Sequence, residues 1–205
     1  MRQRDELFTP TEAAGLSGLT LKAVNNAIDK KTVIARIELR NGHATRLLDR
    51  PAIIHLCLEK RLTGDTTLEF RRRLFAAIAT APARRTVSVG ALKLDLREPR
   101  REVIGRIKEL RRSKRIVVSD PQILGGTPVF WRTRIPVHLI ADLLRQGDTP
   151  EALRASYPRL TDEMIRLAPI YAAAHPPRGR PRKRPLQSRP FGMDISAPLG
   201  NPREN

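Results

Sequence analysis

The sequence is poor in cysteine, in acidic residues and in long apolar runs. Its one cysteine, Cys57, lies in the apolar run AIIHLCLEK, and a lone thiol excludes both a disulfide and a cysteine-based metal site within one chain. The opening stretch MRQRDELFTP has no apolar core of signal-peptide length, and no stretch approaches the roughly 18 apolar residues of a membrane span. We therefore expect a reduced, cytoplasmic protein that is neither secreted nor membrane-spanning.

The residues that could act in catalysis are not arranged in any known catalytic or metal-binding pattern. The histidines at 43, 55, 138 and 175 fall in separate predicted elements with no pair four residues apart, and the acidic residues show no metal-binding spacing. No serine has the strand-turn-helix setting of a nucleophile elbow, and Cys57 is expected to be buried. We predict that the chain is not an enzyme, that it has no catalytic residues, and that it holds neither a metal nor a cofactor.

Positive charge, in contrast, is abundant. The chain has 39 Lys+Arg against 21 Asp+Glu, a net charge of +18 over 205 residues, so polyanions are its default partners. Basic and acidic groups number 11 and 7 in residues 1–62, 15 and 6 in 63–115, 6 and 6 in 116–175, and 7 and 2 in 176–205. Counterion release rewards only basic groups that reach phosphates, so the neutral third segment is the least suited to nucleic acid.

Two short helices are predicted at the N-terminal end. Thr9 can cap the first helix, with Glu12 completing a capping box. Glycines at 15 and 18 are predicted to break this helix, and Thr20 can cap a second one whose apolar residues repeat at helical spacing. The succession of a helix, a tight turn and a helix is typical of DNA-binding domains.

A hairpin and a third helix are predicted to follow. Two β-prone runs are joined by Asn41-Gly42, a dipeptide that tolerates the positive φ angles of a tight hairpin turn, and a helix capped by Asp49 comes next. The pattern of residues 1–62 resembles MerR-like and excisionase-like winged helix-turn-helix domains over about 55 residues. The resemblance implies that the second helix enters the major groove of DNA and that the hairpin is the wing.

Such a domain would present polar residues of the second helix and of the hairpin to DNA. Asparagine can bond bidentately to adenine, and lysine serves phosphates or guanine. The predicted DNA-binding residues are Lys22, Asn25, Asn26, Lys30 and Lys31 on or beside the helix, and Arg36, Arg40, His43 and Arg46 on the hairpin. The alternative is that they are ordinary solvated side chains of a structural module.

Residues 63–115 are predicted to form a small, basic α+β connecting segment. It contains a helix over 65–80, two short strands about Gly90 and a helix over 98–115. The predicted inward residues are Leu68, Leu74, Phe75 and Ile78 in the first helix, and Val103, Ile104, Ile107 and Leu110 in the second. Its arginines form either a phosphate-facing surface or an ordinary solvated one.

In residues 116–175, Gly125-Gly126 raises the question of a phosphate-binding loop. No lysine follows at the required spacing and Pro128 removes a donor amide, so we expect a sharp turn instead. The runs TPVF and TRI suit two strands of a hairpin, and three short helices are predicted after it. Their starts are marked by Pro136, by Pro150 and by Thr161.

This arrangement resembles a bacterial domain of unknown function with a homeodomain-like three-helix fold. The shared positions are Asp120-Pro121, Gly125-Gly126, Pro128-Val129, Thr133-Arg134-Ile135, Val137, Gly147, Tyr157-Pro158 and Leu160-Thr161. Members of that family occur in VapB-type antitoxins, whose partners are VapC-type PIN-domain ribonucleases, so the resemblance implies an antitoxin. One position departs from the family pattern: Arg132 replaces the usual glycine, which predicts either a different turn or strained backbone angles there.

A three-helix domain invites a DNA-binding hypothesis, but the absence of net charge in residues 116–175 favours dimerisation or toxin contact. The residues predicted for dimerisation are Phe130, Trp131, Ile140 and Leu144. For the aromatic pair the alternative is a place in the core.

The last thirty residues, 176–205, contain seven prolines and are predicted to be disordered. Within them PRGRPRKRP resembles the AT-hook, which binds the narrow minor groove of A·T-rich DNA. In an antitoxin, the same arginines would pair with the carboxylates that hold Mg²⁺ in a PIN ribonuclease. The predicted toxin-binding residues are Arg178, Arg180, Arg182, Phe191 and Ile195.

The sequence therefore predicts a mainly α protein. Its parts are an N-terminal winged helix-turn-helix, a small α+β middle segment, a C-terminal hairpin with three helices, and a disordered tail. The leading functional hypothesis is an antitoxin that inhibits a VapC-type PIN-domain ribonuclease and represses its own operon by binding operator DNA, as a homodimer or a larger hetero-oligomer. The alternative is a stand-alone DNA-binding transcription regulator or architectural protein.

Overall fold

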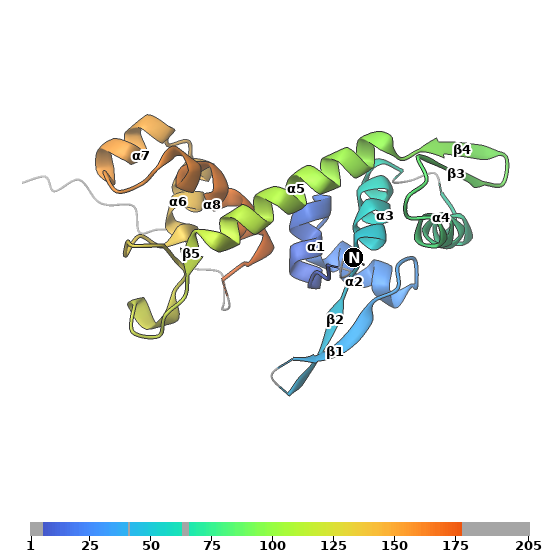
Figure 1. Cartoon of the computed structure of the whole chain (residues 1–205), viewed down its shortest axis with the longest axis horizontal. Coiled ribbons are helices and arrows are strands. Elements are labelled where there is room, and N and C mark those ends of the chain that lie inside the picture. Colours follow the sequence, from blue (N-terminus) through green and yellow to red (C-terminus); the bar gives the residue numbers. More distant parts are fainter. Residues whose placement is uncertain (1–5, 41, 63–65, 178–205) are drawn as a thin grey trace, which may run out of the picture.

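A computed structural model of the chain describes residues 6–40, 42–62 and 66–177. These residues form eight α-helices and three two-stranded antiparallel pairs, so the prediction of a mainly α protein with small hairpins is confirmed (Figure 1). The elements are α1 (Pro10–Ser17), α2 (Leu21–Asp29), β1 (Arg36–Arg40), β2 (His43–Leu47), α3 (Arg50–Arg61), α4 (Leu68–Thr80), β3 (Thr86–Val89), β4 (Leu92–Asp95), α5 (Arg97–Arg115), β5 (Val117–Val118), β6 (Val129–Phe130), α6 (Val137–Gln146), α7 (Pro150–Ser156) and α8 (Asp162–Ala174).

Local capping signals define α1 and α2. The Thr9 hydroxyl accepts from Glu12 N, and the Glu12 carboxylate accepts from Thr9 N, so the predicted capping box is present. Gly18 ends α1 in the left-handed conformation, and Thr20 caps α2. The prediction that Gly15 breaks α1 is wrong, because Gly15 lies inside the helix and serves a close contact with α8.

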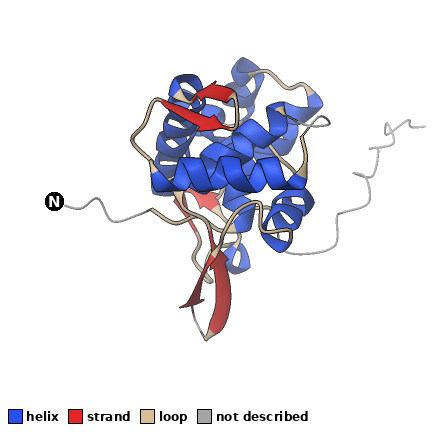
Figure 2. Cartoon of the chain, turned by 90° about the vertical axis from the view of Figure 1, so that its right-hand side faces the viewer, coloured by secondary structure: helices blue, strands red, loops and turns tan. Residues whose placement is uncertain are grey.

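The β1–β2 hairpin stands off from the helices (Figures 1 and 2). Its strands pair from Arg36 with Leu47 to Arg40 with His43, and Gly42 in the turn has a φ of 77°. The apolar residues Ile37 and Leu39 are 72% and 80% exposed, and of the hairpin residues whose burial is described only Leu47, at the base, is buried.

One hydrophobic core joins the N-terminal and middle segments. Its buried residues run from Phe8 to Leu110 and also include Ala174. Most of the predicted inward residues of the middle segment belong to it. Leu68 and Ile104 do not, because they are 40% and 41% exposed. Residues 66–110 therefore complete the N-terminal unit, because α4 and α5 pack against α3 and the β3–β4 hairpin packs against α4.

A second core lies in the C-terminal unit, where α6, α7 and α8 pack together beside β5 and β6. The predicted hairpin of TPVF with TRI is present, because Val129 and Pro136 form an antiparallel bridge and Phe130 N donates to the Ile135 carbonyl. In addition, β6 pairs with β5, which precedes the glycine turn and was not predicted as a strand. The segment after β6 closes a tight turn in which Thr133 N donates to the Phe130 carbonyl. Arg132 has a φ of 60°, so this arginine occupies the left-handed conformation that the family's glycine would favour.

The two units meet along α5 and α8. The 19-residue α5 runs from the β3–β4 hairpin to the C-terminal unit, and α8 packs against α5 and α1 (Figure 1). Arg112 pairs with Glu163 at 2.6 Å, and Arg166 pairs with Glu109 at 2.9 Å, so two ion pairs cross this junction.

The end of α8 lies directly on α1. A methyl group built on Gly15 would lie 3.2 Å from the backbone nitrogen of Ala174, a tighter contact than side chains usually make, so glycine suits this close approach. Beside it the buried Glu12 carboxylate accepts from Lys114 of α5, and His175 Nε2 lies 3.6 Å from the same carboxylate. The Glu12 carboxylate thus links α1 to α5 and to the end of α8.

Candidate nucleic-acid interface

The exposed side of α2 carries most of the predicted DNA-binding residues. Lys22, Asn26, Lys30 and Lys31 are exposed, and Asn25 is partly buried. In the part of the chain that the structure describes, none of the three lysines forms an ion pair or a side-chain hydrogen bond. Their charges are therefore available to an external anion, and positions 22 and 26 lie one above the other on the helix.

The hairpin arginines are less free than the lysines of α2. Arg46 donates to Asp29 at the end of α2 at 2.9 Å, which ties the hairpin to that helix. Arg36 lies 3.9 Å from the Asp49 carboxylate. His43 is exposed beside the turn and pairs with Arg40 across the hairpin, and the Arg40 side chain lies outside the described residues.

Two arginines of the middle segment have a role that no sequence pattern indicated. The Arg72 guanidinium donates to the Lys30 carbonyl at 2.9 and 3.2 Å, and Arg106 donates to the Leu16 carbonyl at 2.7 Å. Each bond satisfies a carbonyl at the C-terminal end of α2 or α1, where positive charge also suits the helix dipole. These arginines position the helix pair, and no local pattern distinguishes them from solvated ones.

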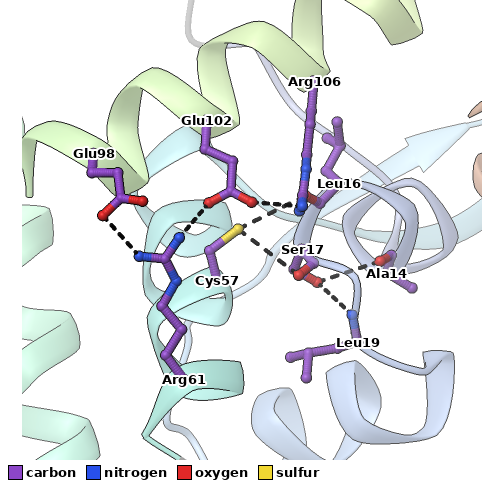
Figure 3. A network of polar contacts seen from close by, with 9 residues as sticks. All are labelled: Ala14, Leu16, Ser17, Leu19, Cys57, Arg61, Glu98, Glu102 and Arg106. Carbon is purple, nitrogen blue, oxygen red and sulfur yellow. Dashed lines mark hydrogen bonds and ion pairs between the residues drawn. The ribbon is translucent and has the colours of Figure 1, made fainter.

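A polar network fixes the turn between α1 and α2 to α3 and α5 (Figure 3). Ser17 Oγ donates to the Ala13 carbonyl and accepts from Leu19 N, which closes the turn. Arg61 of α3 bridges to Glu98 and Glu102 of α5.

Two buried side chains of α3 lie outside this interface. The Cys57 thiol faces the Leu16 and Ser17 carbonyls, and burial raises its pKa to about 11, so it stays protonated and unreactive. Burial, assisted by Arg71, lowers the pKa of His55 to about 4. In the ranges that the structure describes, no group of three or more His, Cys, Asp and Glu residues could hold a metal ion.

The residues predicted for dimerisation fall into two groups. Phe130 and Ile140 are fully buried in the second core, so their assignment to a dimer surface is corrected: a folded chain cannot offer them to a partner. Leu144 is partly buried against the same core. Trp131 is 52% exposed, and the Arg132 guanidinium lies 4.2 Å from its ring centre, which leaves an exposed cation-π pair beside the turn.

The predicted toxin-binding residues Arg178, Arg180, Arg182, Phe191 and Ile195 lie outside the described residues. The structure describes the chain up to residue 177, immediately before this segment. Pro176 lines a shallow hollow with Gly18 and Leu21, at the turn between α1 and α2.

Among the described residues, no helix has the length and apolarity required to cross a membrane.

Two comparisons define the class of protein. The family model described as "Protein of unknown function (DUF433)" matches residues 117–172, which comprise most of the C-terminal unit. The chain is 36% identical to the "Uncharacterized protein y4eO" of Sinorhizobium fredii over 192 residues, covering 86% of this chain and 85% of that protein. The chain therefore belongs to the family of y4eO.

The similarity to a solved structure is weaker than the similarity to y4eO. The crystal structure of RV2018 from Mycobacterium tuberculosis matches with a TM-score of 0.35 and 16% identity, covering 78% of this chain and 96% of that one.

Proposed function

We propose that the N-terminal unit is a winged helix-turn-helix that binds operator DNA through α2. The observation that carries this proposal is the set of exposed lysines on and beside α2, unpaired within the described ranges, with Asn25 and Asn26 between Lys22 and Lys30. Lysines without an internal partner gain most from counterion release when they meet phosphates. The two asparagines supply the amide groups that can pair with an adenine edge.

The surrounding contacts support this assignment of roles. Arg72 and Arg106 hold the C-terminal ends of α2 and α1, and Arg46 holds the hairpin to α2 through Asp29. A helix that is fixed at its end and beside its hairpin presents its polar side in one orientation, which is what discrimination between base pairs requires. In this proposal β1–β2 is the wing and lies along the neighbouring phosphates.

Binding of the full chain to the DNA upstream of its own gene tests the proposal. The double substitution Asn25→Ala and Asn26→Ala should relax sequence preference by about 1 to 3 kcal/mol for each base that the variant no longer reads. Replacing Lys22 and Lys30 with glutamine should weaken binding to all sequences and reduce the salt slope by about 0.9 for each phosphate that is no longer neutralised.

Gln146→Ala is the matched control, because Gln146 is an exposed residue of α6 in the other unit. It should leave affinity and selectivity unchanged. Wild-type selectivity in the double asparagine variant would remove α2 as the recognition helix.

We further propose that the protein is an antitoxin whose C-terminal part binds and inhibits a VapC-type PIN-domain ribonuclease, as a homodimer or a larger hetero-oligomer. The family resemblance of residues 116–175 motivates this step, together with their balanced charge. The exposed pair Trp131 and Arg132 is a suitable anchor, since aromatic and arginine side chains dominate protein interfaces. Co-expression with the product of an adjacent gene, followed by affinity purification, should recover a complex that Trp131→Ala weakens.

One observation favours a stand-alone DNA-binding regulator as the second candidate. Residue 176 lies beside Leu21, the first residue of α2, so the basic segment continues from the side of the proposed recognition helix. Arg178 to Arg182 follow within six residues, a reach of about 20 Å at full extension. These arginines could therefore contact the same DNA duplex as α2. A full chain that binds DNA tightly but copurifies with no adjacent gene product would favour this candidate.

A further inference from the structure

A cavity of about 280 Å³ opens between the start of α3, the end of α4 and the first half of α5. The base of the β1–β2 hairpin borders it through Arg36. Its wall is amphipathic: Ile54, Ile78 and Ile104 are among its apolar lining residues, and Arg50 and Arg100 are among its charged ones. A concave, mostly apolar surface with a few convergent polar groups is the usual form of a small-molecule site.

The two arginines have donors that the protein does not use. Arg50 Nε and both Nε and Nη2 of Arg100 are buried, and none of these three nitrogen atoms has an acceptor in the described part of the chain. Arg100 donates only from Nη1, to the Pro82 carbonyl, and burial lowers the pKa of its guanidinium. A buried charge is normally compensated, so an anion in the cavity beside these guanidinium groups would supply the missing negative charge.

The acidic residues of the lining do not supply that acceptor. Both Glu6 carboxylate oxygens accept from Arg111, at 2.6 and 2.5 Å. One Asp49 oxygen caps α3 by accepting from Ala52 N, and the other lies 3.9 Å from Arg36. Both carboxylates are therefore engaged, and within the lining the charges of Arg50 and Arg100 remain uncompensated.

We propose that this cavity binds a small organic oxyanion, a carboxylate or phosphate monoester attached to an apolar group. Guanidinium groups bind such oxyanions through paired N–H bonds, and the three isoleucines would contact the apolar part. A ligand the size of benzoate or phenyl phosphate fits within the cavity volume of about 280 Å³.

Thermal unfolding of the full chain with four probes at constant ionic strength tests this proposal. A compound that binds only the folded state raises the melting temperature. Benzoate and phenyl phosphate probe the two anion types, inorganic phosphate lacks the apolar group, and benzamide lacks the charge. We expect benzoate, phenyl phosphate or both to raise the melting temperature by more than inorganic phosphate does, and benzamide to have no effect.

Two variants locate the binding. Arg100→Met removes the unpaired donors and should weaken binding of the effective probe at least tenfold by calorimetric titration. Ile104→Trp fills the cavity from its exposed rim, so it should block binding even if Arg100→Met folds poorly. The matched control is Arg101→Met, since Arg101 is the exposed neighbour and does not line this cavity.

Several results would overturn the proposal. One is that no probe raises the melting temperature, and another is that every variant responds as the wild type does. A third is that Arg100→Met weakens binding to duplex DNA while no probe binds, which would assign the free donors to a DNA phosphate. Binding of the probes does not depend on the proposed DNA-binding function, so the two can fail separately.

Discussion

Arg72 of α4 donates two hydrogen bonds to the backbone carbonyl of Lys30, at 2.9 and 3.2 Å, although the two residues are 42 positions apart. Lys30 is the C-cap of α2, and Lys31 after it has a φ of 56°. The middle segment therefore fixes the point where the lysine-bearing helix ends. Some basic residues of this segment therefore stabilise the folded N-terminal unit, and the others form part of its charged surface.

Arg72→Met should loosen the end of α2. The substitution keeps the apolar stem and removes the donors, which should lower the free energy of unfolding by about 1 kcal/mol. Amide hydrogen exchange at the end of α2 should accelerate, and the affinity for operator DNA should fall because Lys30 and Lys31 are less ordered. Arg73→Met is the control, since among the described residues exposed Arg73 bonds only to Glu69 within α4. Equal exchange rates in the two variants would contradict this role for Arg72.

Gly15→Ala and Gly105→Ala should have opposite effects on stability. Alanine favours a helix over glycine by up to about 1 kcal/mol, and a methyl group at residue 105 would meet nothing within 4 Å. Gly105→Ala should therefore raise the melting temperature. At residue 15 the methyl group would press on the backbone of α8 at 3.2 Å, with an expected cost of about 1 to 3 kcal/mol. Thermal unfolding of both variants checks the pair, and a stabilised Gly15→Ala protein would show that α8 does not lie tightly on α1.

What the sequence predicted well depends on residues close together in the chain. The capping box of Thr9 and Glu12, the Gly18 terminus and the turn at Gly42 are all set by neighbours within four positions, and all are present. The exposure of Lys22, Lys30 and Lys31 follows from their place on the polar side of α2 and just after it.

Distant contacts were not predictable in the same way. Whether Gly15 breaks a helix or admits another one depends on α8, far along the chain, and the additional pairing of β6 with β5 depends on how the glycine turn folds back. Phe130 illustrates the same limit, because an aromatic residue in a hairpin has the same local pattern whether it lies in a core or at an interface. The unpaired donors of Arg50 and Arg100 become evident only once several distant elements are assembled.

The buried His55 should make the protein less stable in mild acid. Its pKa is about 4 in the folded chain and 6.5 when exposed, so only the unfolded chain takes up the proton as the pH falls below 6.5. The free energy of unfolding should decrease by about 3 kcal/mol between pH 6.5 and 4 from this group. Denaturant titrations across that range should show a shallower pH slope for His55→Leu than for the wild type. Identical slopes in His55→Leu and wild type would mean that His55 does not control this titration.

Truncation after residue 177 separates the two proposed roles of the basic segment. If Arg178, Arg180 and Arg182 pair with the carboxylates of a PIN ribonuclease, the truncated protein should keep most of its DNA binding and release the ribonuclease activity of the copurified toxin. In this case the bound C-terminal unit would raise the local concentration of these arginines at the toxin. Removing them should then weaken inhibition by more than the affinity of the isolated segment would indicate. If they instead lie on DNA beside α2, inhibition should persist.

In that second case, binding to A·T-rich DNA should weaken, and the salt slope should become shallower by about 0.9 for each phosphate that is no longer neutralised. RNA cleavage and DNA binding are therefore measured on the same truncated protein. The position of residue 176 at the α1–α2 turn makes the DNA outcome geometrically accessible, so both assays are needed. Replacing Arg178, Arg180 and Arg182 with glutamine in the full chain is the matched control, because it keeps the length and removes the charge. Full inhibition by both proteins would contradict the inhibitory role and leave these arginines to DNA.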